Sequence, residues 1–370
     1  MRKMISWLVT IVMLVSMFAP ITVSATLEQS KPELMIYSQE CPQAVVSYAT
    51  QSYLHHVNSM ASLDLLKISG RVSLGSPFTI MDDESNQPVF YFPVINNNKI
   101  IATFRVYVDE SRTKNVSTPI YAGILSEFMV PELNRLSSLT SKDAIALLYM
   151  DNHNVMLRIN GQTELLIESP EGDAPTSTIA TVRSNYQVAQ AFDAIAEGAV
   201  SNDQDRSSTR ILLAVNINET QPSGREWCAA YAASLIIRYK INSTSPRSYH
   251  IMSMFHGTNP AETDRLTDSQ VIQAANSYDL YPVLASYRIS NGSVISQIQS
   301  YSPVYFVGQR TTNGEHGYHA MVICGYDLTT NMLMIWNPWY DHLETINMNF
   351  SQYVAGDYSY TWVRTIYNWQ

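Results

Sequence analysis

The run Cys228–Ile237 constrains the fold of this chain more than any other segment. It reads CAAYAASLII and contains no charged residue. Alanine is the strongest helix former, and Pro222 and Gly224 in the polar stretch before the run place the helix start near Cys228. Small alanine side chains also let such a helix pack closely on a neighbour. We therefore predict a central helix that begins at Cys228.

Two interpretations of Cys228 are open at this point. An isolated cysteine among alanines is most often a buried core side chain. A thiol at a helix N-terminus can instead act as a nucleophile, because the helix dipole favours the thiolate and lowers the thiol pKa. The chain has three cysteines, so a Cys228–Cys324 disulfide with Cys41 left over is a further arrangement. An odd cysteine in an exported chain favours a reactive thiol.

A C-terminal hairpin supplies the predicted partners of the Cys228 thiol. Residues 318–326 and 332–336 alternate as strands do, and residues 327–331 form the connection. If the hairpin folds about Leu328, His319 lies opposite Asn337, and directly opposite residues share a face about 5 Å apart. Asn337 can then accept a hydrogen bond from one imidazole nitrogen and leave the other for Cys228. The spacing predicts a Cys–His–Asn triad.

No catalytic role is predicted for Cys324, Cys41 or His316. Cys324 falls on the strand face opposite His319, where a core position is expected, and Cys41 is interpreted as incidental. His316 precedes His319 by three positions, in residues 312–317 that we predict to be a flexible loop. No third ligand with suitable spacing follows, so neither a metal site nor a cofactor is predicted.

Three sequence blocks resemble papain-like cysteine peptidases, and among these the staphopains, which are secreted bacterial enzymes. The blocks are WCAAYAAS, YHAMVICGY and MIWNPWY, in the order Cys–His–Asn, and the similarity extends from about Asn216 to the C-terminus, including GDY and WVRTIY. The resemblance implies an α+β fold in which an N-terminal helix packs on an antiparallel sheet. It also implies an endopeptidase that cleaves proteins through an acyl-enzyme, without a cofactor.

The resemblance assigns roles to individual residues of the triad. Cys228 matches the nucleophile, His319 the general base and acid, and Asn337 the residue that orients the imidazole. Gln221 matches the glutamine whose amide completes the oxyanion hole together with the backbone N–H of Cys228. Seven positions separate Gln221 from Cys228, whereas papain-like enzymes usually have six, and a bulge at Ser223-Gly224 would absorb the extra residue.

Two tryptophans are expected to support this site. Trp339 matches the indole that shields the His–Asn hydrogen bond from water, which would keep that bond strong. Trp227, which directly precedes the nucleophile, is expected to support substrate binding.

The first residues of the chain have the features of a secretory signal peptide, predicted to span residues 1–25. Arg2 and Lys3 form a basic start, residues 5–19 are almost wholly apolar, and Val23-Ser24-Ala25 supplies small residues at the cleavage site. The apolar run is short for a membrane span, which needs about 20 residues, and an uncleaved anchor is the alternative. We expect secretion into the extracellular medium, and the resemblance implies a Gram-positive bacterial source.

Charge divides the rest of the chain into two parts. Residues 26–205 carry 21 acidic against 11 basic side chains, whereas residues 206–370 carry 11 against 10. Residues 197–210 between them are polar and lack aromatic side chains, which is typical of an exposed linker where proteases cut. The resemblance implies that residues 26–205 are a folding and inhibitory propeptide. Residues 206–370 then form the peptidase domain.

The N-terminal part is predicted to be an α+β unit. Residues 43–66 have helical apolar spacing, whereas residues 89–95 and 100–108 are strand-like around an asparagine turn at 96–98. Pro93 restricts the first of these strands to a sheet edge. A second hairpin is predicted from residues 154–158 and 163–167 around Asn160-Gly161. His55 and His56 would point about 100° apart on a helix and cannot readily share one ion.

Partners and alternative functions follow from these features. The net charge of −9 argues against a nucleic-acid partner, which would favour basic patches. The expected partners are protein or peptide substrates, the chain's own propeptide as inhibitor and a dedicated protein inhibitor, with no stable membrane association. One alternative is a cell-wall peptidoglycan amidase or endopeptidase of the Cys–His type. The other is a non-catalytic secreted binding protein on a peptidase scaffold.

Overall fold

A computed structural model describes residues 32–370 of the chain, apart from residues 83–87, 114–117, 140–143, 170–179, 181, 201–208, 313–314 and 357. The described residues form a mixed α+β fold, and Pro32–Gln370 is one compact unit. The predicted signal peptide, at residues 1–25, lies outside the described residues. So does the predicted boundary between residues 205 and 206.

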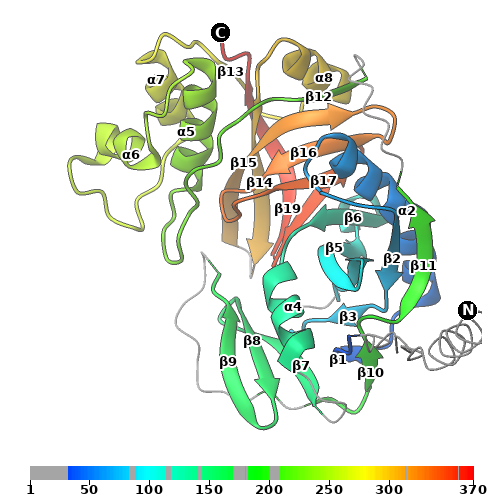
Figure 1. The fold of residues 1–370 in the computed structure, drawn as a ribbon. Helices are drawn as coiled ribbons and strands as arrows, with labels where there is room; N and C mark the ends of the chain where they lie inside the picture. The colour runs from blue at the N-terminus through cyan, green and yellow to red at the C-terminus, as the bar shows by residue number, and fades with distance from the viewer. Residues whose placement is uncertain are drawn as a thin grey trace, which may run out of the picture. The chain divides into compact units, whose positions relative to one another are not determined.

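In the residues that the structure describes, the N-terminal part consists of three helices set among strands (Figure 1). In chain order its elements are β1 (Met35–Gln39), α2 (Gln43–Ser62), β2 (Arg71–Gly75), β3 (Phe78–Thr79), β4 (Phe90–Asn96), β5 (Lys99–Val108), α3 (Glu110–Thr113), β6 (Tyr121–Ser126), α4 (Val130–Leu139), β7 (Ile145–Asp151), β8 (Asn154–Ile159), β9 (Gln162–Ile167), β10 (Tyr186–Gln190) and β11 (Ala194–Ala199).

The C-terminal part begins with a short strand, continues with helices and ends in long strands (Figure 1). Its elements are β12 (Arg210–Leu212), α5 (Cys228–Lys240), α6 (Ser248–His256), α7 (Asp268–Asn276), β13 (Val283–Ala285), α8 (Asn291–Gln299), β14 (Val304–Thr312), β15 (Glu315–Asp327), β16 (Met332–Trp336), β17 (Leu343–Asn347), β18 (Gln352–Ala355) and β19 (Tyr358–Tyr367).

One sheet runs through both parts of the chain. Its strand order is β11-β2-β4-β5-β6-β17-β16-β15-β14-β19-β13, with β3, β12 and β18 paired alongside. The junction is the antiparallel pair β6–β17, in which Ile124 lies opposite Ile346. A smaller sheet, β10-β1-β7-β8-β9, contains only N-terminal strands. The predicted propeptide and the predicted peptidase domain therefore share a hydrogen-bonded sheet.

Helix α5 is central, as its sequence predicts. Its alanines and aliphatic residues are buried in one core with Ala320, Val322 and Cys324 of β15. The next residues along that strand, Met321 and Ile323, face the opposite way, into a core shared with α8. Strand β15, which carries the predicted histidine, is therefore covered by helices on both faces. Helices α5, α6 and α7 lie together on one side of the sheet (Figure 1).

Most local predictions for the N-terminal part are confirmed. Helix α2 begins at Gln43 as expected, and β4 and β5 form the predicted hairpin around Asn97 and Asn98, both with positive φ. Strands β8 and β9 pair around Asn160-Gly161, where φ is also positive at both residues, as a two-residue hairpin turn requires.

The prediction that Pro93 lies in an edge strand is wrong. Strand β4 is internal, since it pairs with β5 on one side and with β2 and β3 on the other. The second side is shared by two short strands: β3 pairs with Phe90 and Tyr91, and β2 pairs with Val94 and Ile95. Pro93 falls in the interval between them, so its missing N–H does not interrupt a ladder.

The predicted exposed linker, residues 197–210, is partly sheet. Residues 197–199 belong to β11 and pair with β2, and Arg210 begins β12, which pairs with β15. Gly198 lies so close to α2 that a Cβ there would be 2.2 Å from Leu54 Cδ1. The small residues that resemble a linker therefore allow a strand to pack closely beneath a helix.

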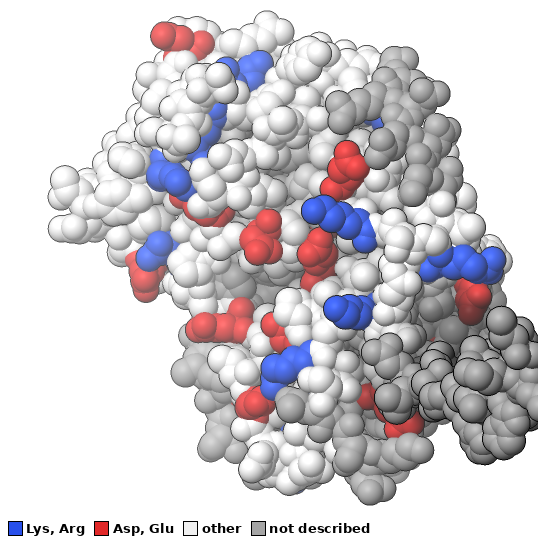
Figure 2. Space-filling model, in the orientation of Figure 1, with Lys and Arg blue, Asp and Glu red and all other residues white. Residues whose placement is uncertain are grey.

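The described residues contain no helix that is both long and apolar enough to cross a membrane. On the face of the molecule drawn in Figure 2, basic and acidic side chains are interspersed and separated by uncharged surface. Neither sign of charge dominates that face.

Candidate active site

Cys228 is the first residue of α5, where the sequence places it. The side chain is partly exposed and lines a cavity of about 640 Å³ at the N-terminal end of the helix. No disulfide joins any of the chain's cysteines, all of which lie in the described residues. The residues that line the cavity include Gln221, Cys228, Arg265, Asp268, Tyr305, Val307, Arg310, Tyr318, His319 and Arg364.

His319 lines the same cavity and is hydrogen bonded to Asn337. Its Nε2 lies 2.8 Å from Asn337 Oδ1, and its Nδ1 has no hydrogen-bond partner among the described residues. Asn337 Oδ1 also accepts from the backbone N–H of Trp339 at 3.0 Å, which identifies this atom as the amide oxygen. The Nε2 atom must therefore carry the proton, and Nδ1 keeps an unshared lone pair, as a base requires.

The predicted register of the hairpin is wrong, although the pair it predicted is present. Asp327 lies opposite Met332, and a bulge at Cys324 shifts the pairing so that Val322 lies opposite Trp336. The turn is therefore centred near residues 329 and 330 rather than on Leu328. Asn337 follows the end of β16 and reaches His319 diagonally, which a long side chain can do within one face of a hairpin.

Trp339 packs against the His319 ring, with 4.4 Å between ring centroids. Tyr360 contacts the same ring at 5.3 Å. Both aromatic rings lie against the histidine that bonds to Asn337, and the shielding of that bond from water stays a prediction for Trp339. Because neither residue lines the Cys228 cavity, their contribution is to the histidine rather than to a bound chain.

The electrostatic surroundings of His319 favour the neutral ring. Burial lowers its pKa to about 4, and the positive charge of Arg310 acts in the same direction, whereas the hydrogen bond to Asn337 opposes the change. An imidazolium at this position therefore requires a nearby negative charge. Cys228, Glu226 and Asp268 line the same cavity and are the acidic groups that it offers.

Gln221 lies at the rim of the same cavity and is 3% exposed. Its backbone N–H donates to Pro338 O at 2.8 Å, which ties the glutamine loop to the residue after Asn337. Its side-chain Nε2 donates to the carbonyl oxygen of Arg225. One N–H of the amide is therefore occupied locally, and the second is the one available to a bound oxyanion.

A turn at Ser223-Gly224 accommodates the long spacing between Gln221 and Cys228. Gly224 has φ +71°, a conformation that glycine adopts without strain. Ser223 donates from its hydroxyl to the carbonyl of Ser169, at the end of the β8–β9 hairpin, at 2.8 Å. The loop next to the nucleophile is thus held by the N-terminal part.

Two charged residues that the sequence analysis did not select, Glu219 and Arg238, hold the segment leading to Gln221. The carboxylate of Glu219 accepts from the hydroxyls of Ser234 at 2.5 Å and Ser248 at 3.1 Å, and lies 3.4 Å from Arg238. An arginine directly after the apolar run of the helix is the signal that could have identified this anchor.

The other selected residues have structural surroundings. Trp227 is buried, donates from its indole to Ala261 O at 2.8 Å and does not line the cavity. Cys324 is fully buried, and burial raises the pKa of its thiol, in agreement with a core role. His316 belongs to β15 rather than to a loop, with its Nδ1 2.6 Å from Gln309. Within the described ranges, no three acidic, histidine or cysteine side chains are placed to hold a metal ion.

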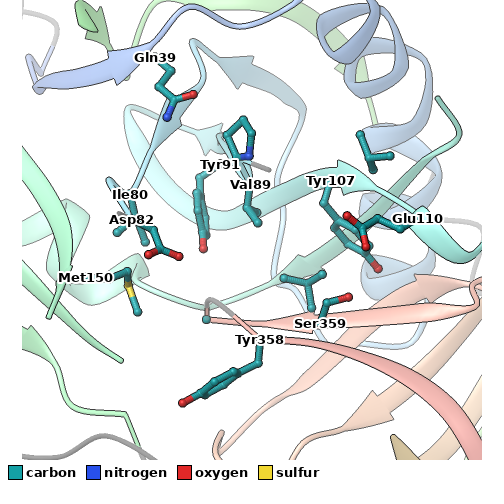
Figure 3. A pocket seen from close by; sticks show the side chains of 14 residues that line it. Gln39, Ile80, Asp82, Val89, Tyr91, Tyr107, Glu110, Met150, Tyr358 and Ser359 are labelled. Carbon is teal, nitrogen blue, oxygen red and sulfur yellow. The ribbon is translucent and has the colours of Figure 1, made fainter. Parts of the chain in front are cut away.

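A second cavity, of about 240 Å³, lies away from Cys228 (Figure 3). Figure 3 shows Tyr91 and Asp82 at one end and Tyr107 and Glu110 at the other. It lies where N-terminal strands meet Val354, Tyr358 and Ser359. Its lining joins the two parts of the chain.

Comparison with protein families connects this geometry to known proteins. Residues 213–366 match the Peptidase_C39 like family. The matched range contains Cys228, His319 and Asn337 and supports a C39-like cysteine peptidase. A search of curated proteins found no match.

A candidate C39-like peptidase from Bacillus anthracis is among the similar solved structures. Its identity to this chain is 14%, and the alignment covers 42% of this chain and 96% of that one, with a TM-score of 0.27.

Proposed function

We propose that this protein is a secreted cysteine endopeptidase made as a precursor, with Cys228, His319 and Asn337 as its catalytic residues. The observation that carries the proposal is the imidazole of His319. Its Nε2 is bound to Asn337, its Nδ1 has no partner among the described residues, and it shares a cavity with Cys228. This arrangement matches the roles of nucleophile, base and orienting group.

The proposed reaction begins when His319 Nδ1 takes the proton of Cys228. The thiolate attacks the peptide carbonyl carbon, a C–S bond forms, and the carbonyl π electrons move to oxygen. The second Gln221 N–H and the backbone N–H of Cys228 stabilise that oxyanion. His319 then donates its proton to the leaving amine as the C–N bond breaks. Water, deprotonated by His319, releases the acyl group as a carboxylic acid and restores the thiol.

The buried surroundings of His319 support a mechanism in which the charge on its ring depends on the charge of Cys228. Because burial lowers the His319 pKa to about 4, an imidazolium is favoured only while the Cys228 thiolate lies beside it. Once the thiolate is consumed in the acyl-enzyme step, the ring loses that stabilisation. It then donates readily to the leaving amine.

The N-terminal part is proposed to restrain the loop next to the nucleophile until the chain is cut. The contact of Ser169 with Ser223 places the end of β9 against the loop between Gln221 and Cys228. A second contact is the tilted packing of the His153 ring against Tyr358, at 4.6 Å between ring centroids. Secretion through residues 1–25 would deliver the precursor outside the cell.

Casein cleavage by the purified protein tests the proposal. Wild-type protein under reducing conditions should digest casein after a cut in residues 197–210, whereas Cys228→Ala should show no activity. Cys324→Ala is the matched control, because it removes a buried thiol outside the cavity and should retain activity. Digestion of purified peptidoglycan but not casein would exclude an endopeptidase of proteins, and residual casein cleavage by Cys228→Ala would exclude the thiol mechanism.

A further inference from the structure

The orienting asparagine is the middle of a longer buried chain of hydrogen bonds. Asn337 Nδ2 donates to the hydroxyl of Tyr353 at 3.0 Å, and that hydroxyl donates to Glu344 Oε2. The other carboxylate oxygen, Glu344 Oε1, is paired with the guanidinium of Arg105. All these side chains are essentially inaccessible to solvent. The chain runs from His319, on β15, to β5 in the N-terminal part.

Three alternate residues, two in β5 and one directly after it, bind the segment that carries Tyr353. Arg105 donates to Val354 O at 3.0 Å, and Tyr107 donates to Gln352 O at 2.6 Å. The carboxylate of Asp109 accepts from the Ser351 hydroxyl at 2.6 Å. Successive odd-numbered residues lie on one face of a strand. One face of the N-terminal part therefore holds β18 on both sides of the tyrosine.

Each hydrogen bond along this chain has a defined donor and acceptor, because the charges of Arg105 and Glu344 compensate each other. Arg105 is fully buried and its charge is satisfied by Glu344, which keeps the carboxylate an acceptor. An accepting carboxylate makes the Tyr353 hydroxyl its donor, and burial followed by the Glu344 charge holds the pKa of that tyrosine well above its usual range. The hydroxyl oxygen is then left to accept from Asn337, which turns the amide oxygen toward His319.

We propose that Arg105 is a positioning residue for the triad, acting through Glu344 and Tyr353 on the orientation of Asn337. The N-terminal part thereby contributes a side chain to the assembly of the active site. This inference rests on the proposed function. It assigns a role to a residue 123 positions before the nucleophile, in the part of the chain that the sequence indicates is only a propeptide.

Loss of Arg105 should reverse the direction of the chain. A buried carboxylate without its cation takes up a proton, because its charge is no longer compensated. Protonated Glu344 can donate to the Tyr353 hydroxyl, whose own proton is then free to point toward the asparagine. The Asn337 nitrogen would then face a donor at Tyr353, and only the backbone N–H of Trp339 would still hold the amide oxygen toward His319 Nε2.

Alkylation of Cys228 by iodoacetamide tests this proposal without a substrate. The rate is measured by mass spectrometry from about pH 4 to about pH 9 on the full chain, with Cys41→Ser as background. A thiolate held by His319 gives fast labelling below the usual thiol pKa of about 8.5. Arg310 acts on His319 in every variant, so its influence cancels in the comparison.

Tyr353→Phe and Tyr107→Phe form the matched pair of variants. Each removes one buried hydroxyl near the contact between the two parts of the chain. The Tyr353 hydroxyl is bonded to Asn337 and Glu344, whereas that of Tyr107 is bonded to Gln352 O. We expect Tyr353→Phe to slow labelling near pH 6 about fivefold to tenfold, as loss of one hydrogen bond implies, and Tyr107→Phe to match wild type. Equal profiles for both variants, whether changed or unchanged, would overturn the proposal.

A second set of variants removes one or both charges of the Arg105–Glu344 ion pair and tests whether the labelling rate is restored. Arg105→Met should slow labelling as Tyr353→Phe does, whereas Arg105→Met with Glu344→Gln should restore it, because the glutamine oxygen accepts from Tyr353 without a buried charge. A double variant no faster than Arg105→Met would contradict the proposal. If Arg105→Met does not fold, the tyrosine pair still decides.

The wild-type profile separates this inference from the proposed function. If wild-type Cys228 reacts no faster than an ordinary thiol near pH 6, the proposed thiolate–imidazolium pair is wrong. If wild type reacts fast and Tyr353→Phe reacts equally fast, only the role of Arg105 and its relay is wrong.

Discussion

At the scale of single residues, two buried histidines are held neutral by the fold. Burial lowers the pKa of His319 to about 4 and that of His56 to about 3. His319 has a cavity beside it and a partner that can stabilise its charged form. His56, on α2, has its Nδ1 3.0 Å from the Thr345 hydroxyl of β17 and packs on Phe104. The first is suited to chemistry and the second to stability.

His56 should make the protein sensitive to acid. The unfolded chain binds a proton at His56 near pH 6.5, whereas the folded chain does so only near pH 3. Since the unfolded state binds more protons in this interval, stability falls as the pH drops from about 6.5 towards 3. His56→Gln keeps a hydrogen-bonding amide and removes the titration. Between pH 6.5 and 4, the free energy of unfolding measured in urea should fall less for His56→Gln than for wild type. We expect the two falls to differ by up to about 2–3 kcal/mol.

His55→Gln is the control for that measurement, because His55 is the exposed neighbour of His56 on the same helix. Its stability curve should follow that of wild type at every pH. Parallel curves for wild type and His56→Gln would show that His56 does not titrate on unfolding.

Gln221 should affect acylation but not the thiol itself. Gln221→Ala removes an oxyanion donor and should lower kcat for a peptide substrate about 100-fold. Alkylation by iodoacetamide forms no oxyanion, so its rate should change less than about twofold by the same argument. A parallel loss of both rates would instead indicate that Gln221 only supports the loop.

At the scale of elements, the close approach of backbones decides where strands can pair. Strand β12 pairs with β15 at Gly325, where a Cβ would lie 2.6 Å from the carbonyl oxygen of Ile211. That contact is with backbone, so no side-chain rotation can relieve it. It occurs beside the bulge at Cys324, which also sets the position of Asn337 relative to His319.

Gly325→Ala should therefore detach or displace β12. We expect a loss of about 1–3 kcal/mol in the free energy of unfolding, typical of overpacking in a well-packed region. Gly292→Ala is the matched control, since a Cβ at that position in the first turn of α8 meets nothing closer than 3.8 Å. Thermal unfolding of the two variants measures the difference. Equal melting temperatures would contradict the assigned contact.

At the scale of the whole described unit, the two parts of the chain are joined more tightly than a precursor and its inhibitor need to be. They share the β6–β17 ladder, the His56–Thr345 contact and the buried Arg105–Glu344 pair. Separation would turn β17 into an edge strand and leave buried charges unpaired, which is costly. One cut between the parts should not release either of them.

A protease site inserted between residues 203 and 204 tests this expectation. After cleavage, both fragments should elute together from a gel-filtration column at low salt and at about 1 M salt, since buried pairs are screened little. The uncut insertion variant is the control for shape. Two separate peaks after cleavage would show that the sheet does not hold the parts together, and release would then need no further digestion.

The elements of the site were accessible from the sequence because their signals are local. Alanine-rich spacing placed the start of α5 at Cys228, and alternation placed His319 on one strand and Asn337 next to the end of its neighbour. Glycine and asparagine turns identified the hairpins around residues 97–98 and 160–161. Each of these patterns is decided by a residue and its near neighbours.

Contacts between distant residues were decided only by the tertiary structure. Strand alternation alone did not reveal the bulge at Cys324, so it predicted the wrong register for a correct pair. Pro93 became internal because two short strands divide its second side between them. Arg105 and Glu344 are 239 positions apart, and neither has a local pattern that names the other. The sequence alone predicted the candidate residues for the chemistry, whereas long-range packing determined what holds them in place.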